Sequence, residues 1–130
     1  MSEKIKIALL GLGAVGQDFA ENFLEVIQEG SKPVEIVAVA HSDKNSAVAL
    51  GFQQSGVTFF ENAVDIITLG EAVDIIFDLT GSSDTRQALR KGLQESNNRH
   101  TVIAPEMIAK LLWMFFGNNS QIINSKGAGY

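Results

Sequence analysis

The stretch KIALLGLGAVGQDFAENFL, residues 6–24, decides how the rest of the chain is interpreted. It begins with an apolar run of strand length and continues into a pattern in which apolar side chains recur every four residues, the spacing of one helix face. Gly11, Gly13 and Gly16 lie at the junction and spell G-x-G-x-x-G. The stretch predicts a buried strand, a glycine loop and a helix. The glycines are explained either by a phosphate-binding loop or by the turn that a buried strand needs before a helix.

The rest of the chain repeats this switch between apolar runs and helical patterns. After the strand at 5–10 and the helix at 14–28, we expect strands at 34–40, 56–60, 73–79 and 100–104, and helices at 45–54, 61–70, 85–95 and 105–117. Asp84 with Gln87 is predicted to cap the helix at 85–95, and Pro105 to open the last helix. We expect one domain over residues 1–117 and a flexible, polar tail over residues 118–130.

Strands that alternate with helices of this length predict an α/β fold. The expected architecture is a three-layer, Rossmann-like, doubly wound parallel sheet of about five strands in the order 3-2-1-4-5. In such a sheet a ligand lies beyond the carboxyl ends of the strands, where the strand order reverses between strands 1 and 4. The loops at 11–16, 80–84 and 104–106 are therefore expected to form the site.

Composition excludes several classes of function. A net charge of −5, with no run of Lys and Arg to offset it, disfavours DNA and RNA as partners. The absence of cysteine excludes disulfides, thiolate metal sites and thiol nucleophiles, and we expect no metal. No secretory signal is recognisable, and the apolar window at 107–117 is about half the ~20 residues that cross a bilayer. We expect a cytoplasmic protein without nucleic-acid or membrane partners.

The glycine loop is expected to bind the pyrophosphate of a dinucleotide. In this context Gly11 makes the turn, Gly13 lets the pyrophosphate approach the backbone, and Gly16 packs the helix against the strand. Ala14 and Val15 complete the loop at the helix N-terminus, where unpaired N–H groups and a partial positive charge favour phosphate. The alternative is a structural turn in a domain that has no ligand.

The end of the second predicted strand bears on the choice between NAD and NADP. An acidic residue there would accept hydrogen bonds from the adenosine ribose hydroxyls, but Ala40 and His41 occupy the position. His41, Ser42 and Lys44 supply a titratable cation, a hydroxyl and a permanent cation for a 2′-phosphate. The sequence therefore favours NADP over NAD. The alternative is that residues 41–46 form only a solvated turn and a helix cap.

The turn after the fourth predicted strand supplies a second set of binding residues. Thr80, Gly81 and Ser82 are expected to meet the nicotinamide ribose through hydroxyl and backbone groups. They also suit a helix cap, and both roles can hold at once. Asp78, near the end of the strand, is expected to be a partly exposed carboxylate.

Four segments, KIALLGLGAVG, VEIVAVA, VDIIFDLTG and HTVIAPE, carry a family resemblance over about residues 4–106. They resemble the dinucleotide-binding domain of the glucose-fructose oxidoreductase and inositol dehydrogenase group. They are also similar to that domain in homoserine dehydrogenases, dihydrodipicolinate reductases and acylating aldehyde dehydrogenases. The resemblance implies an NAD(P)-binding Rossmann domain. It also implies that substrate binding, oligomerisation and most catalytic groups belong to a second domain, which we expect to be missing here.

Two departures from these families argue against catalysis by the chain alone. The segment APEM at 104–107 lacks the lysine that is catalytic after the fifth strand of the glucose-fructose oxidoreductase group. The cysteine nucleophile of the aldehyde dehydrogenases is also absent.

A second resemblance is to nucleotide-binding-like domains that precede bacterial sensor histidine kinases. These also combine a glycine loop, a DLTG-type fourth strand and an apolar KLLW helix, which here runs from Lys110 to Trp113. The resemblance implies a Rossmann-like unit without a catalytic partner.

The last predicted helix is apolar on all sides. The segment MIAKLLWMFF at 107–116 is apolar at nine of ten positions, so no polar face remains for water. One face can cover the sheet, and the other needs a partner. We expect a homodimer, or docking to another protein, through the helix at 106–116. The alternative is that the tail at 118–130 folds back over it.

Together these features favour a stand-alone NAD(P)-binding module related to oxidoreductases, which senses a nucleotide or redox state or serves as a subunit. The alternative is an NAD(P)-dependent oxidoreductase whose active site is completed by a dimer partner or another chain. Acid–base help would then come from Glu106, Lys110 or His100. His100 begins the fifth strand and is expected to lie away from the ligand edge. A domain that binds no nucleotide is the third interpretation.

Overall fold

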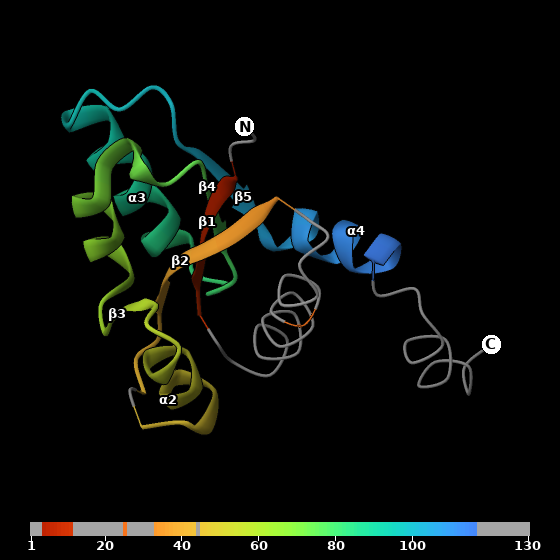
Figure 1. The fold of residues 1–130 in the computed structure, drawn as a ribbon. Helices are drawn as coiled ribbons and strands as arrows, with labels where there is room; N and C mark the ends of the chain where they lie inside the picture. Colours follow the sequence, from red (N-terminus) through yellow and green to blue (C-terminus); the bar gives the residue numbers. More distant parts are fainter. Residues whose placement is uncertain (1–3, 12–24, 26–32, 44, 117–130) are drawn as a thin grey trace.

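A computed structural model describes residues 4–11, 25, 33–43 and 45–116 of the chain. Five parallel strands form one sheet in the order β3-β2-β1-β4-β5 (Figure 1). The strands are β1 Ile5–Leu10, β2 Val34–Ala40, β3 Thr58–Phe60, β4 Ile75–Asp78 and β5 Val102–Pro105. This confirms the predicted α/β fold and its strand order. Apart from residue 25, which is helical, the helix predicted at 14–28 lies outside the described residues, as does the tail predicted at 118–130.

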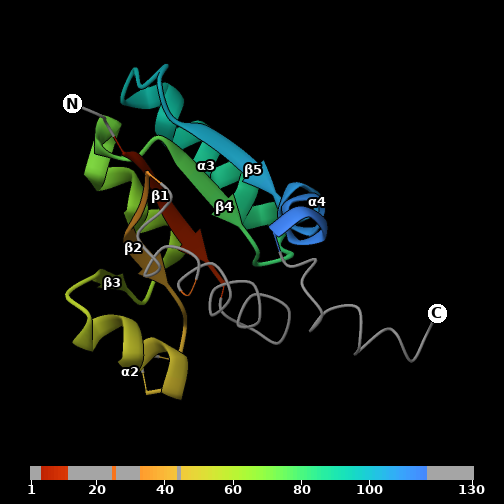
Figure 2. The same cartoon turned by 45° about the vertical axis from the view of Figure 1, so that its right-hand side comes forward.

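Helices cover both faces of the sheet, which gives three layers (Figure 2). They are α2 Ala47–Gln54, the 3-10 helix η1 Ala63–Ala72, α3 Ser83–Glu95 and α4 Glu106–Phe116. Helices α2 and α4 pack on one face, and η1 and α3 pack on the other. Within the described part of the chain, no helix combines the length and the hydrophobicity needed to span a bilayer.

The central strand, β1, is buried because its side chains alternate between two apolar clusters. Ile7 and Leu9 belong to the cluster under α2 and α4, whereas Ala8 and Leu10 belong to the cluster under η1 and α3. Burial on both faces explains why the run at 5–10 is almost continuously apolar. Since β1 pairs with both β2 and β4, the strand order reverses at this strand.

The N-terminus of α3 is capped by Ser82 and not by Asp84. The Ser82 hydroxyl accepts a hydrogen bond from the Thr85 N–H at 3.1 Å. The predicted cap of Asp84 with Gln87 is therefore wrong. The helix begins at Ser83, so Asp84 lies inside its first turn, where a carboxylate interacts favourably with the helix dipole.

Pro105 ends β5 and does not open α4. Among the described residues β5 pairs only with β4, so it is an edge strand. Proline is tolerated on an edge strand because its missing N–H faces no neighbouring strand. The prediction that Pro105 opens the last helix is thus wrong, whereas the range 106–116 predicted for the apolar helix agrees with α4, Glu106–Phe116.

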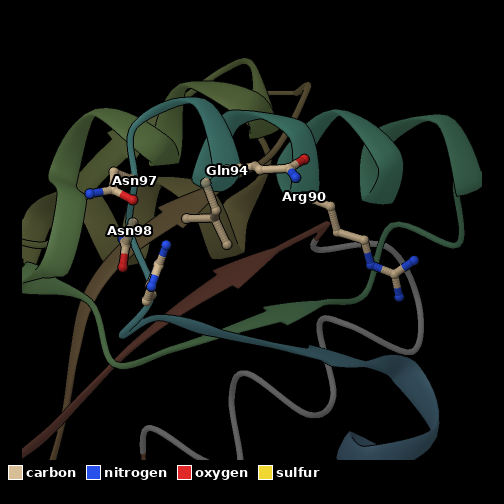
Figure 3. A pocket seen from close by; sticks show the side chains of 6 residues that line it. Arg90, Gln94, Asn97 and Asn98 are labelled. Atoms are coloured by element: carbon tan, nitrogen blue, oxygen red, sulfur yellow. The ribbon is translucent and has the colours of Figure 1, made fainter.

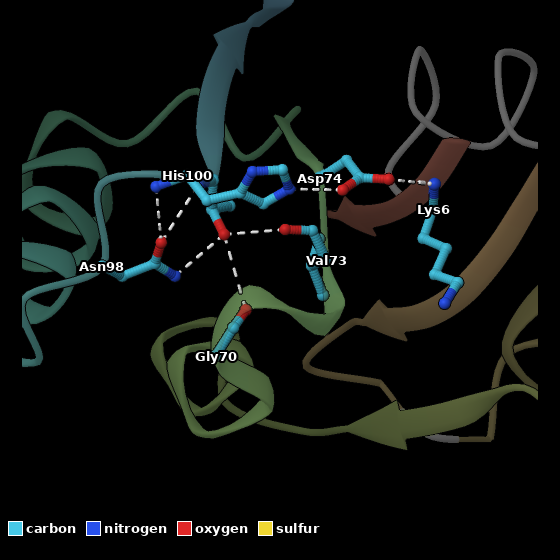
Figure 4. Close-up of polar contacts among 7 residues, drawn as sticks. Lys6, Gly70, Val73, Asp74, Asn98 and His100 are labelled. Carbon is cyan, nitrogen blue, oxygen red and sulfur yellow. Dashed lines mark hydrogen bonds and ion pairs between the residues drawn. The ribbon is translucent and has the colours of Figure 1, made fainter. Parts of the chain in front are cut away.

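Asp74 joins three strands at the amino end of the sheet (Figure 4). Its N–H donates to the Lys6 carbonyl at 2.7 Å, and its carboxylate accepts the Lys6 N–H at 2.8 Å. Its carbonyl accepts the Val102 N–H at 2.9 Å, and its other carboxylate oxygen pairs with Nε2 of His100 at 2.5 Å. The Lys6 N–H, and after it the His100 contact, hold the pKa of Asp74 below its ordinary value. His100 therefore lies at the amino end, away from the carboxyl ends of the strands.

The end of β1 lies against the backbone that follows β4. Gly11 has a φ of +87°, a region in which a side chain is strained. A Cβ on Gly11 would lie 2.8 Å from both N and Cα of Thr80 and 2.9 Å from the carbonyl carbon of Leu79. The fold itself therefore requires glycine here, because the backbone angle and the neighbouring strand both exclude a side chain. The same contact places the exit of β1 beside the turn after β4.

Asp74 makes the fold sensitive to acid. Because its folded-state pKa lies below the ordinary value of 3.8, its stabilising contribution is complete above that pH and is lost as the pH falls through the folded-state pKa. Asp74→Asn should lower the free energy of unfolding at neutral pH and flatten its pH dependence below about pH 4. Urea unfolding across the acid range measures both effects. Glu71→Gln, at an exposed site, is the control that should change neither. An acid-range slope that is the same in Asp74→Asn and the wild type would contradict this role.

Gly11→Ala should destabilise the fold by about 2–4 kcal/mol, because the new methyl group combines backbone strain with overlap on the Thr80 backbone. The matched control is Gly51→Ala in α2, where a Cβ meets nothing within 4 Å. That substitution should stabilise the helix by about 0.5–1 kcal/mol. Thermal and urea unfolding measure both variants. Equal stability of the two alanine variants would show that the contact between β1 and Thr80 is not required.

Candidate functional site

The loops after β1, β2 and β4 leave the sheet from one edge. The first residue after each of these strands donates its N–H to the last residue of a neighbouring strand: Gly11 to Ala40 at 2.9 Å, His41 to Phe60 at 3.0 Å and Leu79 to Leu10 at 2.8 Å. Each bond extends the sheet by one residue. Gly11 and Leu79, which begin the segments after β1 and β4, therefore lie at the same edge of the sheet, as predicted for these two loops, and the segment after β2 lies there as well.

A cleft of about 570 Å³ opens at this edge, within the size range of small-molecule sites. Four residues predicted from the sequence line it: Gly11, His41, Ser42 and Thr80. They come from the loops after three different strands. The reversal of strand order between β1 and β4 thus coincides with a concave surface, as expected for a doubly wound sheet.

The other predicted residues fall into two groups. Gly81 and Ser82 follow Thr80 directly but are not part of the cleft wall. Gly13, Ala14, Val15, Gly16 and Lys44 lie outside the described residues. The third predicted loop, at 104–106, does not line the cleft either.

Sequence reasoning missed the contribution of the segment after β3. Glu61, Asn62 and Ala63 line the cleft, as does Thr85 in the first turn of α3. The segment reaches the cleft because β3 pairs with β2, which puts the residue after Phe60 close to His41. The polar pair Glu61-Asn62 directly after an apolar strand was the available signal.

Asp78 is fully buried, so the expectation of a partly exposed carboxylate is wrong. One carboxylate oxygen accepts the Thr80 N–H at 3.1 Å and the Thr80 hydroxyl at 2.6 Å. The other accepts Nε of Arg86 at 3.3 Å. These donors, one of them cationic, compensate the loss of water around the carboxylate.

Hydrogen bonds hold the turn after β4 in one arrangement. The Thr80 hydroxyl accepts the Ser82 N–H at 3.1 Å, and the Ser82 hydroxyl accepts the Thr85 N–H. Gly81, between them, has a φ of +71°. Ser82 thus acts as a helix cap, one of the two roles predicted for it.

An imidazole, hydroxyl groups and a carboxylate line the cleft. His41 and Ser42 line it from the end of β2, and the exposed Glu61 lines it from the end of β3. No acidic residue lies at the end of β2, but Glu61 lies directly after the neighbouring strand, β3. Among the described residues, no group of three or more His, Asp or Glu side chains could hold a metal ion.

A second depression, of about 410 Å³, lies at the C-terminal end of α3 (Figure 3). Arg90, Gln94, Asn97 and Asn98 contribute to its lining, and the Arg90 side chain points away from the two asparagines. The Asn98 side chain is already hydrogen-bonded to His100 and Thr101. This depression lies at the amino end of β5, opposite the edge at which doubly wound sheets bind ligands. The 570 Å³ cleft is therefore the better candidate site.

Comparison with protein families identifies the domain. Residues 11–105 match the family described as "Homoserine dehydrogenase, NAD binding domain". This confirms the predicted similarity to the homoserine dehydrogenases. No curated protein matches the chain significantly.

Solved structures agree with the family. Homoserine dehydrogenase from S. aureus at pH 6.5 is 30% identical over 79% of this chain and 26% of that chain, with a TM-score of 0.57. The same enzyme at pH 7.0 is 27% identical over 92% of this chain and 32% of that chain, with a TM-score of 0.56. The transcriptional regulator Gal80p from Kluyveromyces lactis is 18% identical over 78% of this chain and 26% of that chain, with a TM-score of 0.51, and shares the fold.

The chain spans between a quarter and a third of the length of these structures. The match nevertheless covers Gly11, directly after β1, the described residues that line the cleft, and strands β2, β3, β4 and β5. The chain belongs to the family of homoserine dehydrogenase NAD-binding domains and is an NAD(P)-binding Rossmann domain.

Proposed function

We propose that the chain works by holding a nicotinamide dinucleotide, as a nucleotide- or redox-sensing module or as a subunit, and does not transfer hydride by itself. The observation that carries this proposal is the makeup of the cleft. None of Glu106, Lys110 and His100, the residues considered for acid–base help, lines it. His100 is engaged with Asp74 at the opposite end of the sheet.

In this proposal the dinucleotide lies across the edge at which the strand order reverses. The pyrophosphate binds the loop at 11–16, whose first residue is held beside Thr80. The adenosine lies in the cleft with His41, Ser42 and Asn62, and the nicotinamide end approaches Thr80, Gly81 and Ser82. The cleft fits this ligand in size and offers backbone, hydroxyl and amide groups for its ribose and phosphate oxygens.

The alternative is an NAD(P)-dependent oxidoreductase that is completed by a partner. It is supported by the exposed apolar surface of α4, which begins directly after β5 at the ligand edge. A partner seated there would lie close to the turn after β4 and could supply the missing acid–base group.

We further propose NADP rather than NAD as the preferred cofactor. The end of β2 has no acidic residue, and His41 and Ser42 face the cleft with groups that can bind a 2′-phosphate. Glu61 opposes this preference, because its negative charge lines the same cleft.

Isothermal titration with NAD, NADH, NADP and NADPH tests binding directly. We expect at least one of them to bind, and Gly13→Asp to abolish binding because a carboxylate would enter the pyrophosphate site. Gln54→Glu adds the same charge at an exposed position of α2 and should leave the affinity unchanged. If none of the four binds at millimolar concentration, or if Gly13→Asp keeps the wild-type affinity, the proposal fails.

Glu61→Gln tests the cofactor preference. Removing the charge should raise the affinity for NADPH by roughly 3- to 10-fold and have little effect on NADH, because only NADPH carries the 2′-phosphate that Glu61 repels. Glu71→Gln, outside the cleft, is the control for loss of one negative charge. A fall in NADH affinity with no gain for NADPH would instead mean that Glu61 accepts hydrogen bonds from the ribose, and NAD would be the preferred cofactor.

We propose that α4 mediates homodimer formation. Its exposed apolar side chains recur at helical spacing along one stripe: Met107, Ile108, Leu111, Met114 and Phe115. Ala109 and Leu112, on the opposite side, pack against the sheet. Among the described residues of α4, Glu106 and Lys110 balance each other in charge, so two copies would not repel one another through this helix.

Light scattering after size-exclusion chromatography should give twice the 14.0 kDa chain mass at micromolar concentration. Leu111→Gln should shift this mass toward the monomer, because a polar group at the centre of the apolar stripe weakens association. Lys110→Gln, at an exposed neighbouring position, is the control. A monomeric wild type would contradict the dimer.

A further inference from the structure

We propose that Asp78 is a positioning residue of the dinucleotide site, which fixes the hydrogen-bonding state of the turn Thr80-Gly81-Ser82. The proposal rests on the proposed function of this turn in binding the nicotinamide end. The Asp78 side chain is fully buried and does not line the cleft. In this proposal it nevertheless controls which groups of the turn can hydrogen-bond to the ligand.

The contacts of Asp78 leave the Thr80 hydroxyl no free proton. The Ser82 N–H can only donate, so the hydroxyl oxygen accepts there, at 3.1 Å. Its single proton then points to the Asp78 carboxylate, at 2.6 Å. Toward a ligand, Thr80 can therefore act only as an acceptor.

The Ser82 hydroxyl, unlike that of Thr80, keeps a proton that it can donate to a ligand. It accepts the Thr85 N–H as the cap of α3, so its own proton stays available as a donor. Because Asp78 takes the Thr80 proton, the Ser82 hydroxyl is the one of these two hydroxyls that can donate to a ligand. A ligand oxygen, such as a ribose hydroxyl or a carboxamide carbonyl, is the partner that this arrangement favours.

Arg86 locks the carboxylate on its other side. Its Nε lies 3.3 Å from Asp78, and its side chain is 30% exposed whereas that of Asp78 is fully buried. The pair ties the end of β4 to the second turn of α3, so the turn between them is held at both ends. Asp78 itself is paired in the sheet with Leu10 and Pro105, neither of which needs a polar neighbour.

Stability alone does not call for a carboxylate at this position. A well-packed apolar side chain usually serves a buried site at least as well as an ion pair, which must offset its own desolvation. The two bonds that Asp78 makes to Thr80, directly beside the cleft, give the buried charge a role that an apolar residue could not fill.

A double-mutant cycle of affinity tests the proposal. Asp78→Asn and Thr80→Val should each raise the dissociation constant for NADPH or NADH, measured by dinucleotide fluorescence, by about 5- to 20-fold. The double variant should lose no more than the weaker-binding single variant, because both act through the same bond. Thr80→Ser, which keeps the hydroxyl, should restore near wild-type affinity. Losses that multiply in the double variant would overturn the proposal, since Thr80 would then contact the ligand independently of Asp78.

The double-mutant cycle cannot be completed if Asp78→Asn does not fold or if the wild type binds no dinucleotide, and a further measurement is available for each case. If Asp78→Asn does not fold in thermal unfolding, the comparison of Thr80→Val with Thr80→Ser carries the test. Equal losses of affinity in these two variants would overturn the proposal, because only Thr80→Ser keeps the hydroxyl that bonds to Asp78. If the wild type binds no dinucleotide, the proposed function fails by itself. Amide NMR of the unliganded chain then tests the positioning role. Thr80→Val should shift the Gly81 and Ser82 amide signals, whereas Thr80→Ser should not. Unchanged signals in Thr80→Val would overturn the positioning role.

Discussion

The fold depends on one close contact, in which the end of β1 lies against the peptide between Leu79 and Thr80. Only a residue without Cβ fits there, because a side chain on Gly11 would overlap the Thr80 backbone and strain its own φ. This contact sets the end of β1, where the predicted glycine loop begins, beside the turn after β4. The geometry at Gly11 therefore explains both why the fold requires glycine here and why this residue lines the cleft.

The strand order, and a cleft at the carboxyl ends of the strands, could be predicted from sequence. Strands buried on both faces leave nearly continuous apolar runs, as in residues 5–10, and alternation with helices then restricts the topology to a doubly wound sheet. The family match to residues 11–105 agrees with that inference. Burial pattern is a strong signal because it involves every residue of a strand.

Single polar contacts could not be predicted in the same way. Ser82 and Asp84 are both favourable cap residues, and only the start of α3 at Ser83 shows that Ser82 is the cap. Asp78 can be buried because Thr80 and Arg86 donate hydrogen bonds to its carboxylate. The general tendency of Asp to be exposed does not predict these contacts. Glu61 enters the cleft through the pairing of β3 with β2, a contact between distant parts of the chain.

The central claim is that a nicotinamide dinucleotide binds at the carboxyl ends of β1, β2 and β4. Mapping of backbone amide shifts by NMR during titration with NADPH, and separately with NADH, tests this most directly. The account predicts the largest shifts at Gly11, His41, Thr80 and Gly81, with little change at Asn97 and Asn98 in the second depression. Shifts confined to residues 90–99, with Gly11 and Thr80 unaffected, would contradict it.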